Sequence, residues 1–147
     1  MKIILISGSL GLIGFEAVKF FLEKGYTVLG IDNEMRARLF KIKINFKKKH
    51  EYCRDKFPGK YIHYNYDIRD KKNLESIFKK HSHISLIIHT AAQSSHDWSA
   101  RDPITDFSIN ATGTLNLLEL YRKYCPKAVF IFTSTNKVYG DRVNFFN

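Results

Sequence analysis

Short runs of apolar residues recur along the chain, each long enough for a β-strand and each separated by a segment long enough for a helix. The runs cover residues 2–7, 27–31, 61–65, 85–89 and 128–132. Within them apolar residues follow one another without polar alternation, which is typical of strands covered on both faces. The repeated order of strand, helix and strand predicts an α/β fold, a doubly wound parallel sheet of five strands with right-handed crossovers.

The segments between the runs carry helical periodicity. We expect one helix over residues 12–24, capped by Gly25, and another from Pro103 to about Tyr124, because proline is favoured in the first turn of a helix. The apolar stripes expected on these helices are Ile13, Ala17 and Phe20 or Phe21 in the first, and Leu115, Leu118 and Tyr121 or Arg122 in the second.

Three glycines at every third position follow the first strand, and the first helix begins among them. Gly8 can adopt backbone angles that a side chain forbids, Gly11 lets a phosphate approach the main chain, and Gly14 lets the helix pack closely on the strand. Asp32 follows at the end of the second strand, where a carboxylate binds the ribose hydroxyls of an adenosine. The combination predicts a dinucleotide-binding Rossmann fold, with a glycine turn that binds no nucleotide as the alternative.

The residues after the second strand bear on which dinucleotide is bound. The carboxylate of Asp32 would repel the 2′-phosphate of NADP, so the sequence favours NAD as the cofactor. NADP stays open as an alternative, because the guanidinium of Arg36 or Arg38 could hold a phosphate just past this strand.

Composition and charge narrow the classes of partner. The net charge is +10, but residues 41–60 hold eight lysines and arginines against two acidic residues, so we expect a solvated basic helix and no nucleic-acid partner. No apolar run approaches the roughly eighteen residues of a membrane span, which favours a cytoplasmic protein without a membrane partner. The spacing of Cys53 and Cys125 indicates neither a disulfide nor a zinc site, and His81 and His83 lack a third ligand, so no metal is expected.

Four further motifs follow along the chain. Residues 67–70 read Asp-Ile-Arg-Asp, residues 89–93 His-Thr-Ala-Ala-Gln, residues 110–114 Asn-Ala-Thr-Gly-Thr, and residues 133–141 Thr-Ser-Thr-Asn-Lys-Val-Tyr-Gly-Asp. With the glycine spacing they resemble the extended short-chain dehydrogenases/reductases, a family of NAD-dependent epimerases and dehydratases. The last motif is most similar to that of CDP-paratose 2-epimerases. Ser7, Ser9 and Leu12 depart from the family pattern, in which many members have Thr, Gly and Phe.

The resemblance implies roles for individual residues. Thr135 falls on the family's catalytic Ser/Thr, whose hydroxyl binds the substrate oxygen that becomes a carbonyl, whereas Tyr139 is expected to pack at the strand end. Ser94 and His96 are candidates for substrate binding, the alternative being a loop held by Trp98 and capped by Asp97. The residues assigned to the cofactor are Gly8, Gly11, Leu12, Ile13, Gly14, Asp32, Asn33, Arg36, Asp67, Ile68, Ala91, Ala92, Gln93, Asn110, Thr133 and Ser134, with Asn110 also supporting the active-site strand.

The resemblance also implies a reaction. In the family, NAD takes a hydride from the sugar of a nucleotide sugar, here expected to be a CDP-linked deoxyhexose, and returns it to the other face. A 4-epimerase or a 4,6-dehydratase stays open, because the same residues would serve each reaction. The family's general base belongs to a Tyr-x-x-x-Lys pair. Its one match in spacing, Tyr52 to Lys56, lies in the basic segment and is attributed to chance.

Without that pair in its expected place, we expect residues 1–147 to be a truncated NAD-binding domain that lacks the C-terminal strands and the substrate domain and is inactive alone. A noncatalytic NAD-binding module and the product of a broken gene are the alternatives. Family members often pair through helices, one of which matches residues 103–124, so a homodimer also stays open.

Overall fold

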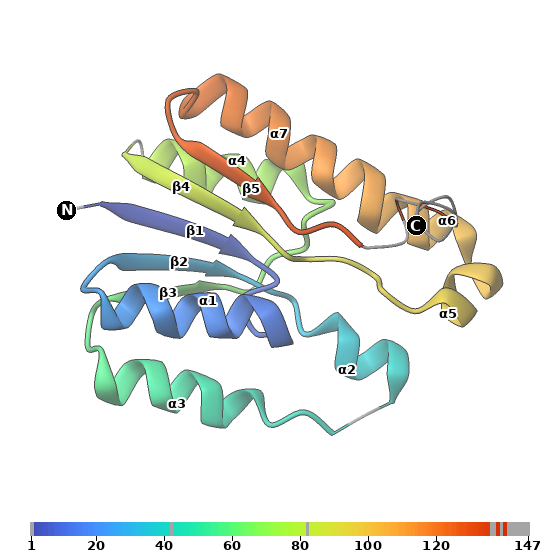
Figure 1. Cartoon of the computed structure of the whole chain (residues 1–147), viewed down its shortest axis with the longest axis horizontal. Coiled ribbons are helices and arrows are strands. Elements are labelled where there is room, and N and C mark those ends of the chain that lie inside the picture. The colour runs from blue at the N-terminus through green and yellow to red at the C-terminus, as the bar shows by residue number, and fades with distance from the viewer. Residues whose placement is uncertain (1, 42, 82, 136–137, 139, 141–147) are drawn as a thin grey trace, which may run out of the picture.

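One five-stranded parallel sheet runs through the centre of the protein (Figure 1). The structure is a computed structural model that describes residues 2–41, 43–81, 83–135, 138 and 140. The strands stand in the order β3-β2-β1-β4-β5, and all neighbours are parallel. Their bounds are Ile3–Ser7 for β1, Thr27–Ile31 for β2, Tyr61–Tyr64 for β3, Ile84–His89 for β4 and Val129–Phe132 for β5. The expected strands and the doubly wound α/β fold are therefore confirmed.

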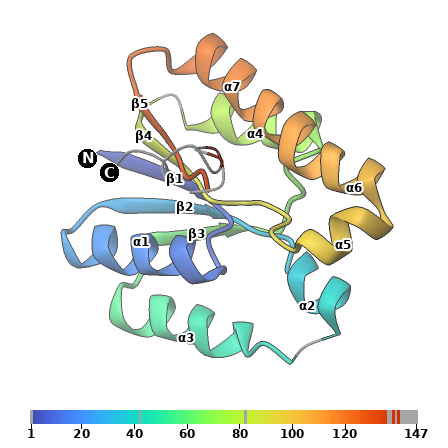
Figure 2. The same ribbon diagram turned by 45° about the vertical axis from the view of Figure 1, so that its right-hand side comes forward.

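Helices cover both faces of this sheet (Figures 1 and 2). Helices α1 and α3 pack on one face, and α4 and α7 pack on the other. The helices are α1 (Leu12–Glu23), α2 (Met35–Phe40), α3 (Phe46–Lys56), α4 (Lys71–Lys80), α5 (His96–Arg101), α6 (Pro103–Phe107) and α7 (Gly113–Tyr124). Over the described residues, none of them is long and apolar enough to cross a membrane.

The register of the strands brings their carboxyl ends to one edge of the sheet. Ser7 at the end of β1 is paired with Ile31 of β2 on one side and with His89 of β4 on the other. The chain order reverses between β1 and β4, so the loops that leave these two strands diverge to opposite faces. A crevice at such a point is where ligands bind in open α/β sheets.

The buried stripe of α1 differs from the one that periodicity predicts. The expected stripe is wrong at Ile13 and Phe20, which are 57% and 54% exposed, whereas Ala17 and Phe21 are half-buried against the core as expected. The fully buried row is Gly14, Val18 and Leu22. Gly14 sets this rotation of the helix, because it packs against the carbonyl of Gly8 in the turn before α1. The row that continues from Gly14 at intervals of four residues is therefore the row that contacts the sheet.

The stripe of α7 is rotated for a similar reason. Leu115 and Leu118 are exposed, whereas Gly113, Leu117 and Leu120 are buried, so the expected stripe is wrong at its two leucines. Tyr121 does pack against the core, as expected. Gly113 lies against the side chain of Ile68 in the loop after β3, and this close approach fixes the face that α7 turns to the core.

The helix expected from Pro103 to Tyr124 is interrupted in its middle. A π-helical turn, η1 (Ser108–Thr112), separates α6 from α7. Such turns insert an extra residue into a helix and commonly lie at functional sites. The turn carries Asn110, whose side chain bonds the backbone of Gln93 in the loop after β4.

Two elements were not expected from the sequence. Helix α2 follows β2 directly and stands between Glu34 and Lys41, which both have left-handed backbone angles with φ of 56° and 50°. The other is α5. Strand β5 also departs from the expectation that both faces of every strand are covered, because Val129, Ile131 and Phe132 are exposed. On this strand only Phe130 packs into the core, against the side of α7.

Candidate cofactor site

The glycine-rich turn is pressed between the ends of β1, β2 and β4. Gly8 has φ of +70°, and a Cβ there would lie 2.7 Å from the backbone nitrogen of Ala91. A Cβ at Gly14 would overlap the carbonyl of Gly8. The amides of Gly8 and Ser9 donate to the carbonyl of Ile31 over 2.8 and 3.2 Å, which anchors the turn to β2. The spacing of the glycines is thus required by close approach of backbone to backbone.

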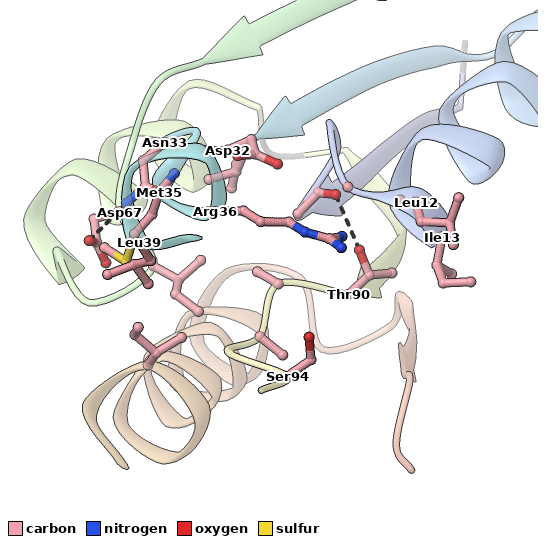
Figure 3. A pocket seen from close by; sticks show the side chains of 18 of the residues that line it. Leu12, Ile13, Asp32, Asn33, Met35, Arg36, Leu39, Asp67, Thr90 and Ser94 are labelled. Atoms are coloured by element: carbon pink, nitrogen blue, oxygen red, sulfur yellow. Dashed lines mark hydrogen bonds between the residues drawn. The ribbon is translucent and has the colours of Figure 1, made fainter. Parts of the chain in front are cut away.

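A cavity of about 420 Å³ opens beside this turn, at the carboxyl ends of the strands (Figure 3). Its size lies in the usual range for small-molecule sites. The sequence-predicted residues that line it are Gly8, Gly11, Leu12, Ile13, Gly14, Asp32, Asn33, Arg36, Asp67, Ile68, Ala91, Ala92 and Ser94. The lining residues that sequence analysis missed are Ile31, Met35, Leu39, Phe40, Tyr66, Thr90 and Ile109. Several of these belong to α2, a helix of six residues, which is too short to be predicted from periodicity.

Asp32 is held rigidly at the edge of the cavity. Its Oδ2 accepts a hydrogen bond of 2.9 Å from the amide of Leu10, and its Oδ1 accepts one of 2.8 Å from the amide of Glu34. Each carboxylate oxygen can accept a second hydrogen bond, so capacity remains for hydroxyl donors of a ligand. The carboxylate that predicts ribose binding therefore stands next to the glycine turn, already oriented by backbone.

A second acidic group closes the far end of the cavity. Asp67 accepts a hydrogen bond of 2.9 Å from the Asn33 side chain and is chelated by the guanidinium of Arg69. Burial raises the pKa of Asp67, but the hydrogen bonds from Arg69 outweigh it and leave that pKa below its usual value. Asn116 of α7 donates to the carbonyls of Ile68 and Arg69 over 3.1 Å, which fixes this loop on the sheet.

Arg36 brings positive charge into the cavity. In Figure 3 its side chain extends from α2 across the opening between Asp32 and Thr90, while Leu12 and Ile13 stand at the other end. Within the described residues Arg36 has no ion-pair partner, so its charge is available to an anionic ligand.

Several predicted residues lie outside the cavity lining. Gln93 is buried and its amide bonds Ser95 and Asp106, while Asn110 bonds the amide and the carbonyl of Gln93 over 2.8 and 2.9 Å. Both residues thus hold the loop that carries Ala91 and Ala92 and do not face the cavity.

The residues that follow β5 lie apart from the cavity lining as well. Thr133 donates to the carbonyl of His89 from both its amide and its hydroxyl, at 3.1 and 3.0 Å, and Ser134 and Thr135 are exposed. The remainder of the motif over residues 133–141, including Tyr139, lies mostly outside the described residues, as do residues 141–147.

The loop after β4 ends at α5, and the cap of this helix is not the one that the alternative for this loop assigned. Ser95, not Asp97, is the N-cap, because its hydroxyl accepts from the amide of Trp98 over 3.3 Å. Ser94 lines the cavity, whereas the side chain of His96 is 84% exposed and lies outside the lining.

A buried histidine supports the cavity from behind, and sequence analysis did not single it out. The Nδ1 atom of His89 lies 2.6 Å from the Ser7 hydroxyl, and its Nε2 atom lies 2.8 Å from the Thr114 hydroxyl. The Thr114 hydroxyl donates in turn to the carbonyl of Asn110. Burial lowers the pKa of His89 to about 4, so the ring is neutral near pH 7.

The Tyr52 and Lys56 pair lies on α3, away from the cavity lining. Lys56 stands over the ring of Tyr52 at 4.8 Å from its centroid, and the Tyr52 hydroxyl faces Glu23 at 3.4 Å. Burial and the charge of Glu23 raise the pKa of Tyr52, which is the opposite of what a general base requires. Among the described residues, no three His, Cys, Asp or Glu side chains gather as metal ligands.

Comparison with known proteins identifies the family. The model of the family described as GDP-mannose 4,6 dehydratase matches residues 5–145. The chain belongs to the extended short-chain dehydrogenase/reductase family of epimerases and dehydratases. A UDP-glucose 4-epimerase of Schizosaccharomyces pombe is 32% identical over 94% of this chain and 36% of its own length. The CDP-paratose 2-epimerase of Salmonella typhi is 34% identical over 94% of this chain and 38% of its own length.

A solved structure of this family supports the same relationship. The UDP-glucose 4-epimerase of Bifidobacterium longum, in complex with NAD+ and UDP, superposes with a TM-score of 0.78 and 27% identity over 95% of this chain and 38% of that one. The chain therefore spans somewhat more than a third of the length of the epimerases that it matches.

Proposed function

We propose that this chain binds NAD as the cofactor-binding part of a sugar-nucleotide epimerase. The observation that carries the proposal is one cavity that combines a turn whose glycines, Gly8 and Gly11, lack Cβ atoms, the N-terminus of α1 and the carboxylate of Asp32. Helix α1 begins at Leu12 without a side-chain cap and without an acidic residue in its first turn. Its first amides are therefore available to the diphosphate, which the glycines allow to come close.

The rest of the dinucleotide also fits the lining. Asp32 would accept hydrogen bonds from the adenosine ribose, and the apolar side chains of Met35, Leu39 and Ile68 would contact the adenine next to Asp67. Ala91 and Ala92 have side chains small enough for the ribose and nicotinamide to lie against the loop after β4. When bound, NAD would take a hydride from a sugar carbon and return it to the opposite face.

We further propose a CDP-linked deoxyhexose as the substrate, with Thr135 binding the reacting oxygen and Ser94 and His96 on the substrate side. The motif over residues 133–141 and the relative from Salmonella typhi support this choice. The UDP-glucose 4-epimerases among the relatives support a 4-epimerase as the second candidate. The exposed Ile104, Phe107, Leu115 and Leu118 on α6 and α7 favour a homodimer, which sedimentation velocity would detect.

The cofactor proposal is tested by calorimetric titration of the purified chain with NAD and NADP, before and after Asp32→Ala. We expect saturable NAD binding that Asp32→Ala weakens roughly ten- to hundredfold, because hydrogen bonds to a charged group contribute about 1.5–3 kcal/mol. The same substitution should narrow the gap between NAD and NADP, since it removes the charge that repels a 2′-phosphate.

Asp55→Ala on the solvated side of α3 is the matched control and should leave NAD affinity unchanged, because Asp55 lies outside the cavity. A folded parent chain that binds no NAD would contradict the proposed function.

The substrate is tested on the NAD-loaded chain with CDP-paratose and UDP-glucose. Within residues 1–147 the Tyr-x-x-x-Lys spacing occurs once, at Tyr52 and Lys56 on α3, away from the cavity. We therefore propose that the chain by itself binds the two sugar nucleotides but converts neither. Saturation-transfer NMR should then report contact with CDP-paratose above contact with UDP-glucose. Chromatography would detect conversion of either compound, and any conversion would overturn the proposal that the chain alone is inactive. Contact with UDP-glucose but not with CDP-paratose would favour the 4-epimerase.

A further inference from the structure

We propose that Lys49, on the basic helix α3, is a positioning residue for the glycine-rich turn and thereby for the diphosphate of the cofactor. Its Nζ lies 2.5 Å from the carbonyl oxygen of Leu10 and 3.4 Å from that of Gly11. The same atom stands 4.7 Å from the centroid of the Phe15 ring on α1. One ammonium group from a distant segment therefore contacts both the turn and the helix that follows it.

Lys49 differs from its neighbours on α3, which are solvated. Lys47 and Lys48 are exposed, and Lys47 makes only a long ion pair of 3.7 Å with Glu51. Lys49 is partly buried, and this burial lowers the pKa of its ammonium even though the charge of Asp32 opposes that effect. A lysine is desolvated in this way only where its hydrogen bonds and charge contacts compensate.

The contact fixes the direction of the turn's peptide groups. Leu10 is held on both sides, since its amide donates to Asp32 and its carbonyl accepts from Lys49. The carbonyl and amide of one peptide group point in opposite directions, so the amide that follows Gly11, that of Leu12, is directed away from Lys49. A cation on a carbonyl also polarises the peptide and strengthens its N–H as a donor.

The ammonium adds to the field at the cofactor site. A smaller cavity of about 250 Å³ adjoins the main one and is lined by Lys49, Arg36 and Asp32 together with Gly11 and Leu12. Two cations and one anion thus stand around the turn that would receive the diphosphate, and low-dielectric walls strengthen their effect. Helix α3 is in this way part of the binding site and not only a solvated face.

This inference rests on the proposed NAD binding and is tested against it. Lys49→Met keeps the length of the side chain and removes the charge, whereas Lys48→Met makes the same change at an exposed position of the same helix. Calorimetric titration should show Lys49→Met weakening NAD and ADP-ribose about tenfold, with Lys48→Met within twofold of the parent. Lys49→Arg, which keeps the charge, should restore most of the affinity.

Two readouts separate positioning from a loss of structure. Adenosine lacks the diphosphate, so NMR titration should give the same weak affinity for it in the parent and in Lys49→Met. The carbonyl ¹³C shift of Leu10 should change in Lys49→Met but not in Lys48→Met. If Lys49→Met fails to fold, Lys49→Gln takes its place in the same comparison.

The possible failures are distinguishable. A parent chain that does not bind NAD overturns the proposed function and this inference with it. A parent that binds NAD, together with a folded Lys49→Met of unchanged NAD affinity, overturns the role of Lys49 alone. Equal losses for adenosine and NAD would also overturn it, because a positioning role predicts a loss that depends on the diphosphate.

Discussion

Gly14→Ala is expected to weaken NAD binding roughly a hundredfold and to lower the free energy of unfolding by about 1–3 kcal/mol. A methyl group at this position would overlap the Gly8 carbonyl and lie 2.8 Å from the Thr90 hydroxyl. Either α1 moves away from the sheet or the turn opens, and both shifts displace the amides of Leu12 and Ile13 from the cavity. Titration with NAD and urea denaturation measure the two effects.

The sign of the change in the free energy of unfolding distinguishes the steric contact from the ordinary effect of alanine in a helix. In an unstrained helix, alanine in place of glycine stabilises by about 1 kcal/mol, so a loss of stability isolates the steric contact. Glu16→Ala, on the exposed side of the same helix, is the control and should change neither quantity by much. A Gly14→Ala chain as stable as the parent, with undiminished NAD affinity, would show that α1 does not pack on the turn as described.

The parts of the fold that the sequence predicted are those that local residues determine. The strands follow from uninterrupted apolar runs, and the turn follows from three glycines spaced three residues apart between a strand and a helix. Asp32 was found for the same reason, since its distance from the glycines along a βαβ unit is nearly fixed. These features place the cavity without any knowledge of tertiary contacts.

Apart from the rotation of α1, the errors arise where the structure depends on a contact between residues that are distant in sequence. The rotation of α7 depends on Gly113 meeting Ile68, a residue from another loop, and periodicity alone cannot reveal that contact. Lys49 reaches Leu10 across 39 residues, so within its basic segment it was indistinguishable from the solvated lysines. Gln93 and Asn110 belong to the motifs from which the cofactor site was predicted. The Asn110 side chain, however, bonds the backbone of Gln93, so this pair joins two segments outside the cavity lining.

His89 is the other distant contact, joining segments that lie 82 and 25 residues away in the sequence. The Thr114 hydroxyl donates to Asn110, so it accepts from Nε2–H of His89, and Nδ1 is then left to accept from Ser7. The neutral ring therefore links β1 and β4 to the first turn of α7, whose Thr114 hydroxyl in turn bonds Asn110 of the π-helical turn. The rings of Phe130 and Phe132 pack near the imidazole at 6.4 and 5.5 Å between centroids, so apolar groups, and not water, surround it on this side.

Acidification is therefore expected to destabilise the protein between about pH 6.5 and pH 4. Burial lowers the pKa of His89 to about 4, and burial together with the charge of His50 lowers that of His63 to about 4. In this window the unfolded chain binds more protons at these two histidines than the folded one, so their contribution to the free energy of unfolding falls as the pH falls and levels off below pH 4. The loss should be about 3 kcal/mol for His89 and less for His63, which is more exposed to solvent.

His89→Gln separates the two contributions, because the glutamine amide can donate to Thr114 but does not titrate. Urea denaturation at a series of pH values should show a lower stability at pH 7, by about 1–3 kcal/mol, and a shallower fall between pH 6.5 and pH 4. His96→Gln is the control, since the side chain of His96 is exposed, and it should reproduce the parent profile. An unchanged fall in His89→Gln would mean that His89 titrates normally in the folded chain, and that the link from β1 through His89 to the π-helical turn does not depend on a neutral imidazole.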